Sequence, residues 1–161
     1  MSMSTAIVEQ DIQVISILKE VEIAAPIEIA FAAMLEEIGP GGEMPGGKPF
    51  PMIVEPWPGG RWYRDLGNNA GHLWGHVQVI KPPTLLELSG PMFMSFPGVN
   101  HVQYRLTRDG DVTRLKFAHQ AMGPIPEEVR EGVGHGWDYG LRRIVEIAGR
   151  MVTEGRREAS R

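Results

Sequence analysis

Between Met52 and Gln120 the sequence alternates apolar and polar residues over short segments that are separated by turn-forming residues. Alternation with a period of two places the apolar side chains on one face of a β-strand. Connections as short as Gly67–Gly71 and Arg108–Asp111 join antiparallel neighbours, because parallel strands need a long crossover. We therefore expect an antiparallel meander with strands at residues 52–55, 60–66, 72–80, 85–89, 100–107 and 112–120.

The segments on either side of the meander are expected to add one strand and two helices. Residues 13–23 alternate and are rich in β-branched side chains, which predicts a strand. Pro26 is expected to open a helix that ends at Gly39, with an apolar stripe of Ile27, Phe31, Met34 or Leu35, and Ile38. Residues 125–154 carry apolar side chains at steps of three and four, which predicts a long amphipathic helix.

The dipeptide Asp109-Gly110 lies between two alternating segments and predicts a two-residue hairpin loop. With these two residues as the loop, the core face pairs Leu106 with Thr113, Tyr104 with Leu115, Val102 with Phe117 and Asn100 with His119. The opposite face, expected to be exposed, carries His101, Gln103, Arg105, Arg114 and Lys116.

Alternation also assigns faces in the preceding hairpin. Val77, Val79, Leu86 and Leu88 are expected on the core face, whereas His76, Gln78 and Glu87 point outward. Trp62 is expected to lie against Gly75, where the missing side chain would make room for the indole.

Composition limits the domain organisation and the classes of partner. A chain of 161 residues, 42% of them hydrophobic, suits one buried core. We expect a flexible N-terminus at residues 1–12, one domain at 13–154 and a tail at 155–161. A formal net charge of −4 argues against a nucleic-acid partner. The absence of cysteine excludes disulfides and fits a cytoplasmic protein, and no apolar run is long enough to span a membrane.

Five sequence motifs resemble those of one known superfamily when their order is considered. They are VEIAAPIEIAFAAM, PGGRWYRD, GHVQVIKPPTLLEL, VTRLKFAHQAM and, at residues 134–144, GHGWDYGLRRI. Together they are similar to the START-like (SRPBCC) helix-grip superfamily, and the last motif resembles the branch of Hsp90-ATPase-activator homologues. This resemblance implies an α+β fold in which a curved seven-stranded antiparallel sheet wraps around a long C-terminal helix and leaves a cavity between them.

Four glycines in the predicted C-terminal helix, Gly132, Gly134, Gly136 and Gly140, cost about 1 kcal/mol each relative to alanine. They are expected to leave space for a ligand between the helix and the sheet. The predicted ligand-binding residues around that space are Trp62, Asn100, Tyr104, Phe117, His119 and Trp137. The alternative is that these side chains only fill the core, and that His119 is a buried histidine satisfied by Asn100 or by the backbone.

The histidines do not predict a metal site, and no cofactor is expected. His72 and His76 would lie about 13 Å apart along a strand. His101 and His119 are expected on opposite faces of the sheet, and no cysteine or helical His pair adds further ligands.

Two loops are candidates for covering the cavity. Residues 39–51 are rich in glycine and proline and are expected to form a mobile flap without regular structure. The segment PMFMSF at residues 91–96 is expected to tuck into the core, to gate a pocket or to meet another subunit. The last option, or contact through an outward Trp74, would make the protein a homodimer.

Three functions therefore remain for the chain. The first is binding of a small hydrophobic or aromatic ligand in an internal cavity. The second is a cyclase- or hydrolase-like enzyme that acts on aromatic or polyketide substrates. The third is a chaperone or protein-interaction module. Binding ranks first, because the predicted pocket has few polar groups that could catalyse a reaction.

Overall fold

The structure is a computed structural model that describes residues 2–160. Its elements in chain order are β1 (Gln13–Ile23), α1 (Ile27–Ile38), β2 (Glu43–Met44), β3 (Lys48–Pro49), β4 (Ile53–Val54), β5 (Arg61–Gly67), β6 (Ala70–Lys81), β7 (Leu85–Gly90), β8 (Val99–Asp109), β9 (Val112–Gly123) and α2 (Glu127–Ala159). Strands β2 and β3 pair with each other in a separate two-stranded sheet.

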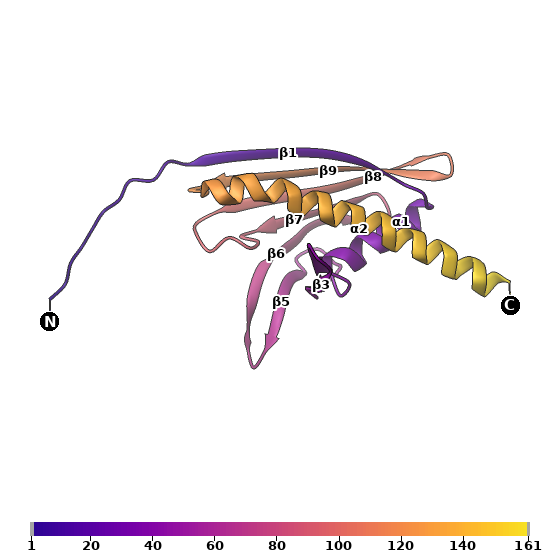
Figure 1. Ribbon diagram of the computed structural model, residues 1–161, viewed down its shortest axis with the longest axis horizontal. Coiled ribbons are helices and arrows are strands. Elements are labelled where there is room, and N and C mark those ends of the chain that lie inside the picture. Colours follow the sequence, from indigo (N-terminus) through magenta and orange to yellow (C-terminus); the bar gives the residue numbers. More distant parts are fainter. Residues whose placement is uncertain (1, 161) are drawn as a thin grey trace.

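The main sheet has seven antiparallel strands in the order β1-β9-β8-β7-β6-β5-β4. The long helix α2 lies across one face of this sheet, and α1 packs against α2 near one end (Figure 1). The predicted meander and the predicted seven-stranded α+β helix-grip arrangement are both confirmed, and the sheet remains open.

Helix α1 shows how the local sequence positions this packing. It begins after Pro26 and ends before Gly39, as predicted. Its buried side chains, Ile27, Ala30, Phe31, Ala33, Met34 and Ile38, include the expected apolar stripe. Burial of that stripe against α2 and the sheet anchors the residues that follow Ile38, which form one side of the cavity described below.

The hairpin between β8 and β9 has the predicted faces but not the predicted pairing. Tyr104 pairs with Phe117, and Leu106 pairs with Leu115, so every partner is displaced by two residues. The loop residues are Gly110 and Asp111, and Gly110 has a φ of +62° at the first loop position, where a type II′ turn favours glycine. Because a shift of two preserves the alternation, the core face is unchanged.

Burial confirms the assignment of these two faces. The side chains of Val102, Tyr104, Leu115, Phe117 and His119 are buried on the core side. On the outer side Arg105, Arg114 and Lys116 are exposed, whereas His101 and Gln103 are half-buried. His101 is covered in part because its ring contacts Glu87 on β7 at 2.8 Å.

A β-bulge corrects the predicted face of Val79. Val77 pairs with Leu88, but Val79 pairs with Glu87, because one extra residue is inserted in β6 between them. The insertion reverses the alternation, so Val79 lies on the face of Glu87 and Ile80 takes its place opposite Leu86.

The predicted pairing of Trp62 with Gly75 is confirmed, but the reason for the glycine differs from the prediction. A Cβ at Gly75 would lie 2.5 Å from the carbonyl oxygen of Ser89, so the space is occupied by the backbone of β7 rather than by the indole.

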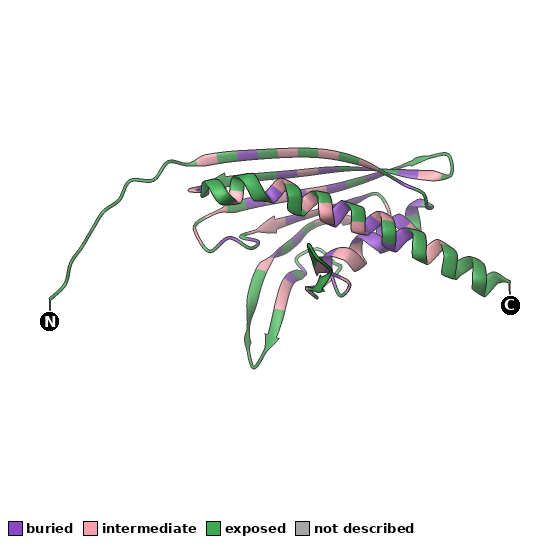
Figure 2. Ribbon diagram, in the orientation of Figure 1, coloured by how far each residue is buried: buried purple, intermediate pink, exposed green. Residues whose placement is uncertain are grey.

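Two predicted boundaries are also wrong. The flap at residues 39–51 is not devoid of regular structure, because β2 and β3 form a short hairpin within it. Helix α2 begins at Glu127 and runs to Ala159, five residues past the predicted end at Glu154, and its last turns are exposed (Figure 2). Polar residues on all sides of these turns extend the helix beyond the apolar stripe.

Candidate functional site

A cavity of about 460 Å³ lies between α2, the end of α1, the flap and strands β5 and β6. The flap contributes Gly42 to Pro45 and Phe50, and the 91–96 loop contributes Met92 and Phe93. The cavity is partly open, and most of its wall is apolar. Space between the C-terminal helix and the sheet was expected from the sequence, and the cavity lies beside that helix, α2.

The glycines of α2 make this space. Gly132, Gly136 and Gly140 are spaced by four residues and line the cavity, whereas Gly134 does not. A Cβ on Gly132 or Gly136 would meet no atom within 4 Å. A Cβ on Gly140 would lie 3.1 Å from a carboxylate oxygen of Glu37. Larger side chains at these positions would therefore project into the cavity or crowd Glu37.

The wall on the side of the sheet is aromatic. Trp62 and Trp74 pack edge to face with their ring centroids 5.1 Å apart, and Phe50 and Phe93 lie 5.8 and 5.9 Å from Trp74. The Trp62 indole N–H donates a hydrogen bond to the carbonyl oxygen of Ile38 at 2.9 Å, which holds this ring beside the end of α1. Packing of this kind keeps the wall rigid.

The predicted outward orientation of Trp74 is wrong. Its side chain is half-buried and lines the cavity. Trp74 is itself the extra residue of a β-bulge in β6, because Gly75 pairs with Trp62 and Leu73 pairs with Tyr63, and this bulge accounts for the change of face. The indole nitrogen of Trp74 is buried and has no hydrogen-bond acceptor among residues 2–160.

The PMFMSF segment tucks into the core, which is the first of its three predicted roles, and it also lines the cavity. Met92 and Met94 are buried, which ties the loop to the core. Met92 and Phe93 also line the cavity, and Phe93 is 40% exposed at its edge. The loop therefore belongs to the cavity wall.

The six predicted binding residues occupy two layers. Trp62 and Trp137 line the cavity directly. The other four, Asn100, Tyr104, Phe117 and His119, are buried in the sheet and lie outside the lining. Phe117 connects the two layers, because the centroid of its ring lies 4.5 Å from that of the Trp137 ring and 5.1 Å from that of the Tyr104 ring.

His119 is the centre of a buried hydrogen-bond chain. Its Nδ1 accepts a hydrogen bond from the Trp137 indole N–H at 2.9 Å, and its Nε2 lies 2.8 Å from Oδ1 of Asn100. The Asn100 amide nitrogen donates to the carbonyl oxygens of Gly90 and Pro91. The ring is therefore neutral with its proton on Nε2, which the alternative of a satisfied core histidine anticipated. Burial lowers the pKa of His119 to about 4, so the neutral form persists at neutral pH.

Glu37, near the end of α1, is a functional candidate that the sequence analysis missed. Its carboxylate lines the cavity, and burial raises its pKa to about 7 although the charge of Arg143 opposes that shift. Burial, and secondarily the charge of Glu37, raises the pKa of the Tyr104 phenol. A signal was present, because Glu37 follows Met34 by three residues and so lies beside the apolar stripe of α1.

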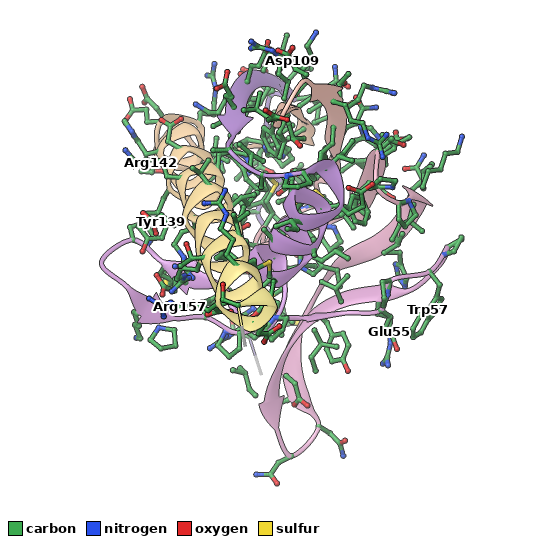
Figure 3. The ribbon with its side chains drawn as sticks, turned by 90° about the vertical axis from the view of Figure 1, so that its right-hand side faces the viewer. Glu55, Trp57, Asp109, Tyr139, Arg142 and Arg157 are labelled. Atoms are coloured by element: carbon green, nitrogen blue, oxygen red, sulfur yellow. The ribbon has the colours of Figure 1, made fainter. Side chains whose placement is uncertain are left out.

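Side chains of α2 hold the flap in place over the cavity. Tyr139, which extends from α2 toward the flap (Figure 3), donates a hydrogen bond to Glu43 at 3.0 Å. Arg143 lies 3.3 Å from the same carboxylate and donates a hydrogen bond to the carbonyl oxygen of Gly41 at 3.1 Å. We call these contacts of Glu43 with Tyr139 and Arg143 the flap latch.

The described residues contain no group of three or more His, Cys, Asp or Glu side chains that could hold a metal ion. Among the same residues, no helix is both long and apolar enough to cross a bilayer.

The sequence profile of one family matches residues 49–149, and that family is described as Activator of Hsp90 ATPase homolog 1-like protein. The matched region runs from the end of β3 into α2 and includes Trp62, Trp74 and the glycines of α2, but it excludes Glu37 and Glu43. No curated protein sequence matches the chain.

Solved structures share the fold at low sequence identity. CalU16 from Micromonospora echinospora has a TM-score of 0.60 and 20% identity, over 91% of this chain and 88% of that one. An uncharacterised protein from Rhizobium leguminosarum has a TM-score of 0.64 and 13% identity, over 89% and 99%. The di-domain ARO/CYC StfQ from the steffimycin biosynthetic pathway has a TM-score of 0.62 and 11% identity, over 87% and 52%. At these identities the likeness establishes the helix-grip fold alone.

Proposed function

We propose that this chain, which belongs to the family of Activator of Hsp90 ATPase homolog 1-like proteins, binds a small hydrophobic or aromatic molecule in its cavity. The observation that carries the proposal is the pairing of three glycines on α2 with an aromatic wall opposite them. Glycine destabilises a helix relative to alanine, so three glycines on one face of α2 call for an explanation. Space for a ligand beside the helix provides it. A volume of about 460 Å³ lies in the range of small-molecule sites.

Two of the six binding residues expected from the sequence would contact the ligand directly. Trp62 and Trp137 supply flat apolar surfaces on opposite walls of the cavity. Asn100, His119 and Phe117 would act behind them by holding Trp137 in one orientation, and Tyr104 would support Phe117. In this proposal the sheet supplies a rigid second layer, and the ligand meets only the first.

The flap would control access. It lies against the cavity with Met44, Pro45 and Phe50, and it is fastened to α2 by the flap latch. Release of these polar contacts would free the flap from α2 without breaking the main sheet, because β2 and β3 pair only with each other.

A cyclase-like enzyme is the second candidate, and Glu37 is the observation that favours it. A carboxyl group with a pKa of about 7 beside an apolar cavity has the properties of a general acid or base. One structural neighbour is an ARO/CYC protein, which is consistent with this candidate. Loss of turnover without loss of binding in Glu37→Gln, on an aromatic or polyketide substrate, would distinguish catalysis from binding.

The binding proposal is tested by native mass spectrometry of the protein purified gently from its own host, with a thermal-shift panel of neutral apolar compounds in parallel. We expect an adduct of small-molecule mass that is lost on denaturation, and a rise in melting temperature with at least some compounds. A protein without any adduct, whose melting temperature no compound changes, would contradict the proposal and favour the interaction-module alternative.

The interaction alternative includes the homodimer expected from the sequence. With Trp74 and the methionines of the 91–96 loop turned inward, the surface that supports it is the outer face of the sheet. There Val14, Met122 and Val99 are exposed and lie side by side across β1, β9 and β8. Sedimentation equilibrium at high protein concentration would give the mass of two chains if this face joins two subunits, and of one chain if it does not.

A further inference from the structure

The charges around the cavity are unbalanced. Two charged side chains belong to the lining, Glu37 and Glu43, and no lysine, arginine or histidine does. Glu43 is paired through the flap latch. Glu37 has no ion pair or side-chain hydrogen bond within residues 2–160. Arg143, the cation whose charge acts on it, is already engaged by Glu43, Glu146 and Gly41. An ionised Glu37 therefore leaves one uncompensated negative charge beside an apolar wall.

The walls around this carboxylate are of the kind that attracts cations. Six aromatic side chains line the cavity: Phe50, Trp62, Trp74, Phe93, Trp137 and Tyr139. The faces of such rings carry partial negative charge and bind ammonium groups, most strongly when water is excluded. An anionic ligand would meet the same charge as its own at Glu37, and no basic side chain in the lining would offset the repulsion.

We propose that the ligand is an apolar or aromatic amine, whose ammonium group pairs with the carboxylate of Glu37 while its apolar body lies against the aromatic walls. This inference rests on the proposed binding function and specifies the class of ligand. Gly140 permits the contact, because a side chain there would occupy the space in front of the Glu37 carboxylate.

Binding of an amine should be coupled to release of a proton. In the free protein the carboxyl group has a pKa of about 7, so about half of the molecules carry a proton on Glu37 at pH 7. The groups around it are Arg143 and Tyr139 on α2, the Tyr104 phenol on β8 and Glu43 on the flap. An ammonium group beside Glu37 favours the carboxylate and expels that proton.

Calorimetric titration with three naphthalenes of equal size separates charge from apolar contact. The probes are 1-naphthylmethylamine, 1-naphthylmethanol and 1-naphthoic acid, which are cationic, neutral and anionic at pH 7. We expect the amine to bind about tenfold more tightly than the alcohol, and the acid to bind most weakly. In Glu37→Gln the ratio of amine to alcohol affinity should fall to about threefold or less, because only the aromatic faces then attract the ammonium group. Glu36→Gln is the control. It removes a carboxylate from the preceding residue, which does not line the cavity, and should keep the wild-type ratio of amine to alcohol affinity.

The possible outcomes of this titration bear on different claims. Equal affinity of the wild type for amine and alcohol would overturn the amine inference and leave the binding function intact. Retention of the wild-type amine preference in Glu37→Gln would overturn the role of Glu37. Failure of all three probes to bind would contradict the binding function itself. Titration of the amine at pH 7 in two buffers of different ionisation enthalpy should show release of about half a proton, and no release would also overturn the inference.

Discussion

The indole N–H of Trp137 on α2 donates a hydrogen bond to Nδ1 of His119 on β9 across 2.9 Å. This bond connects the cavity to the buried side of the sheet, because Trp137 lines the cavity and His119 continues to Asn100 and the backbone at Gly90. The orientation of one cavity wall is thus fixed by polar groups that a ligand would not touch.

Trp137→Phe tests this connection. The substitution keeps an aromatic ring but removes the donor, which leaves Nδ1 of a buried histidine without a partner. We expect the free energy of unfolding in urea to fall by about 1–3 kcal/mol. Trp57→Phe is the matched control, since Trp57 is 55% exposed and lies far from α2 (Figure 3). A Trp137→Phe variant as stable as the control would show that the bond contributes nothing.

The stability of the protein should depend on the protonation of Glu37. Its folded pKa of about 7 exceeds the ordinary glutamate value of 4.5, so this group favours the folded state fully below pH 4.5. That stabilisation is lost as the pH rises through 7 and amounts to at most about 3 kcal/mol. Relative to the wild type, Glu37→Gln should therefore become more stable between pH 5 and pH 8 in urea unfolding. A constant difference between the two proteins would mean that Glu37 has an ordinary pKa.

Loss of the flap latch should loosen the flap without unfolding the domain. Tyr139→Phe removes the hydrogen bond to Glu43, whose carboxylate is a charged acceptor. Amide hydrogen exchange over residues 41–50 should become about tenfold faster, while exchange in β8 and β9 stays the same. Arg142→Ala, an exposed neighbour on α2, serves as the control. Unchanged amide exchange over residues 41–50 in Tyr139→Phe would show that this hydrogen bond does not hold the flap.

Alternation and turn chemistry were sufficient to predict the sheet. The bounds of β1 agree with the prediction, and the side chains predicted for the core face of β8 and β9 are buried. The β-bulges were not predictable, because an inserted residue such as Gln78 or Trp74 in β6 leaves no mark in the alternation. One of these bulges turned Trp74 into the cavity. The short β2–β3 hairpin was missed because composition alone suggested an irregular loop.

Only those features of the site that depend on a single helix or strand could be predicted from the sequence. The glycines of α2 pointed to the cavity, and Trp62 and Trp137 were expected beside it. Glu37 was not expected, because its burial depends on α2 and the flap, which approach it from distant parts of the sequence. His119 and Asn100 were predicted to interact, but Asn100 pairs with Ala121 and reaches the histidine diagonally.

The most direct test of the account is a fluorescence titration of wild type, Gly136→Leu and Gly149→Leu with the neutral apolar probe N-phenyl-1-naphthylamine. Both substitutions replace a helical glycine whose Cβ would meet no atom within 4 Å, but only Gly136 lines the cavity. Both should favour the helix by about 1 kcal/mol, so neither should lower the melting temperature. The account predicts that Gly136→Leu binds the probe at least about tenfold more weakly, whereas Gly149→Leu binds it like the wild type. Equal binding by all three proteins would contradict the assignment of this cavity as the ligand site.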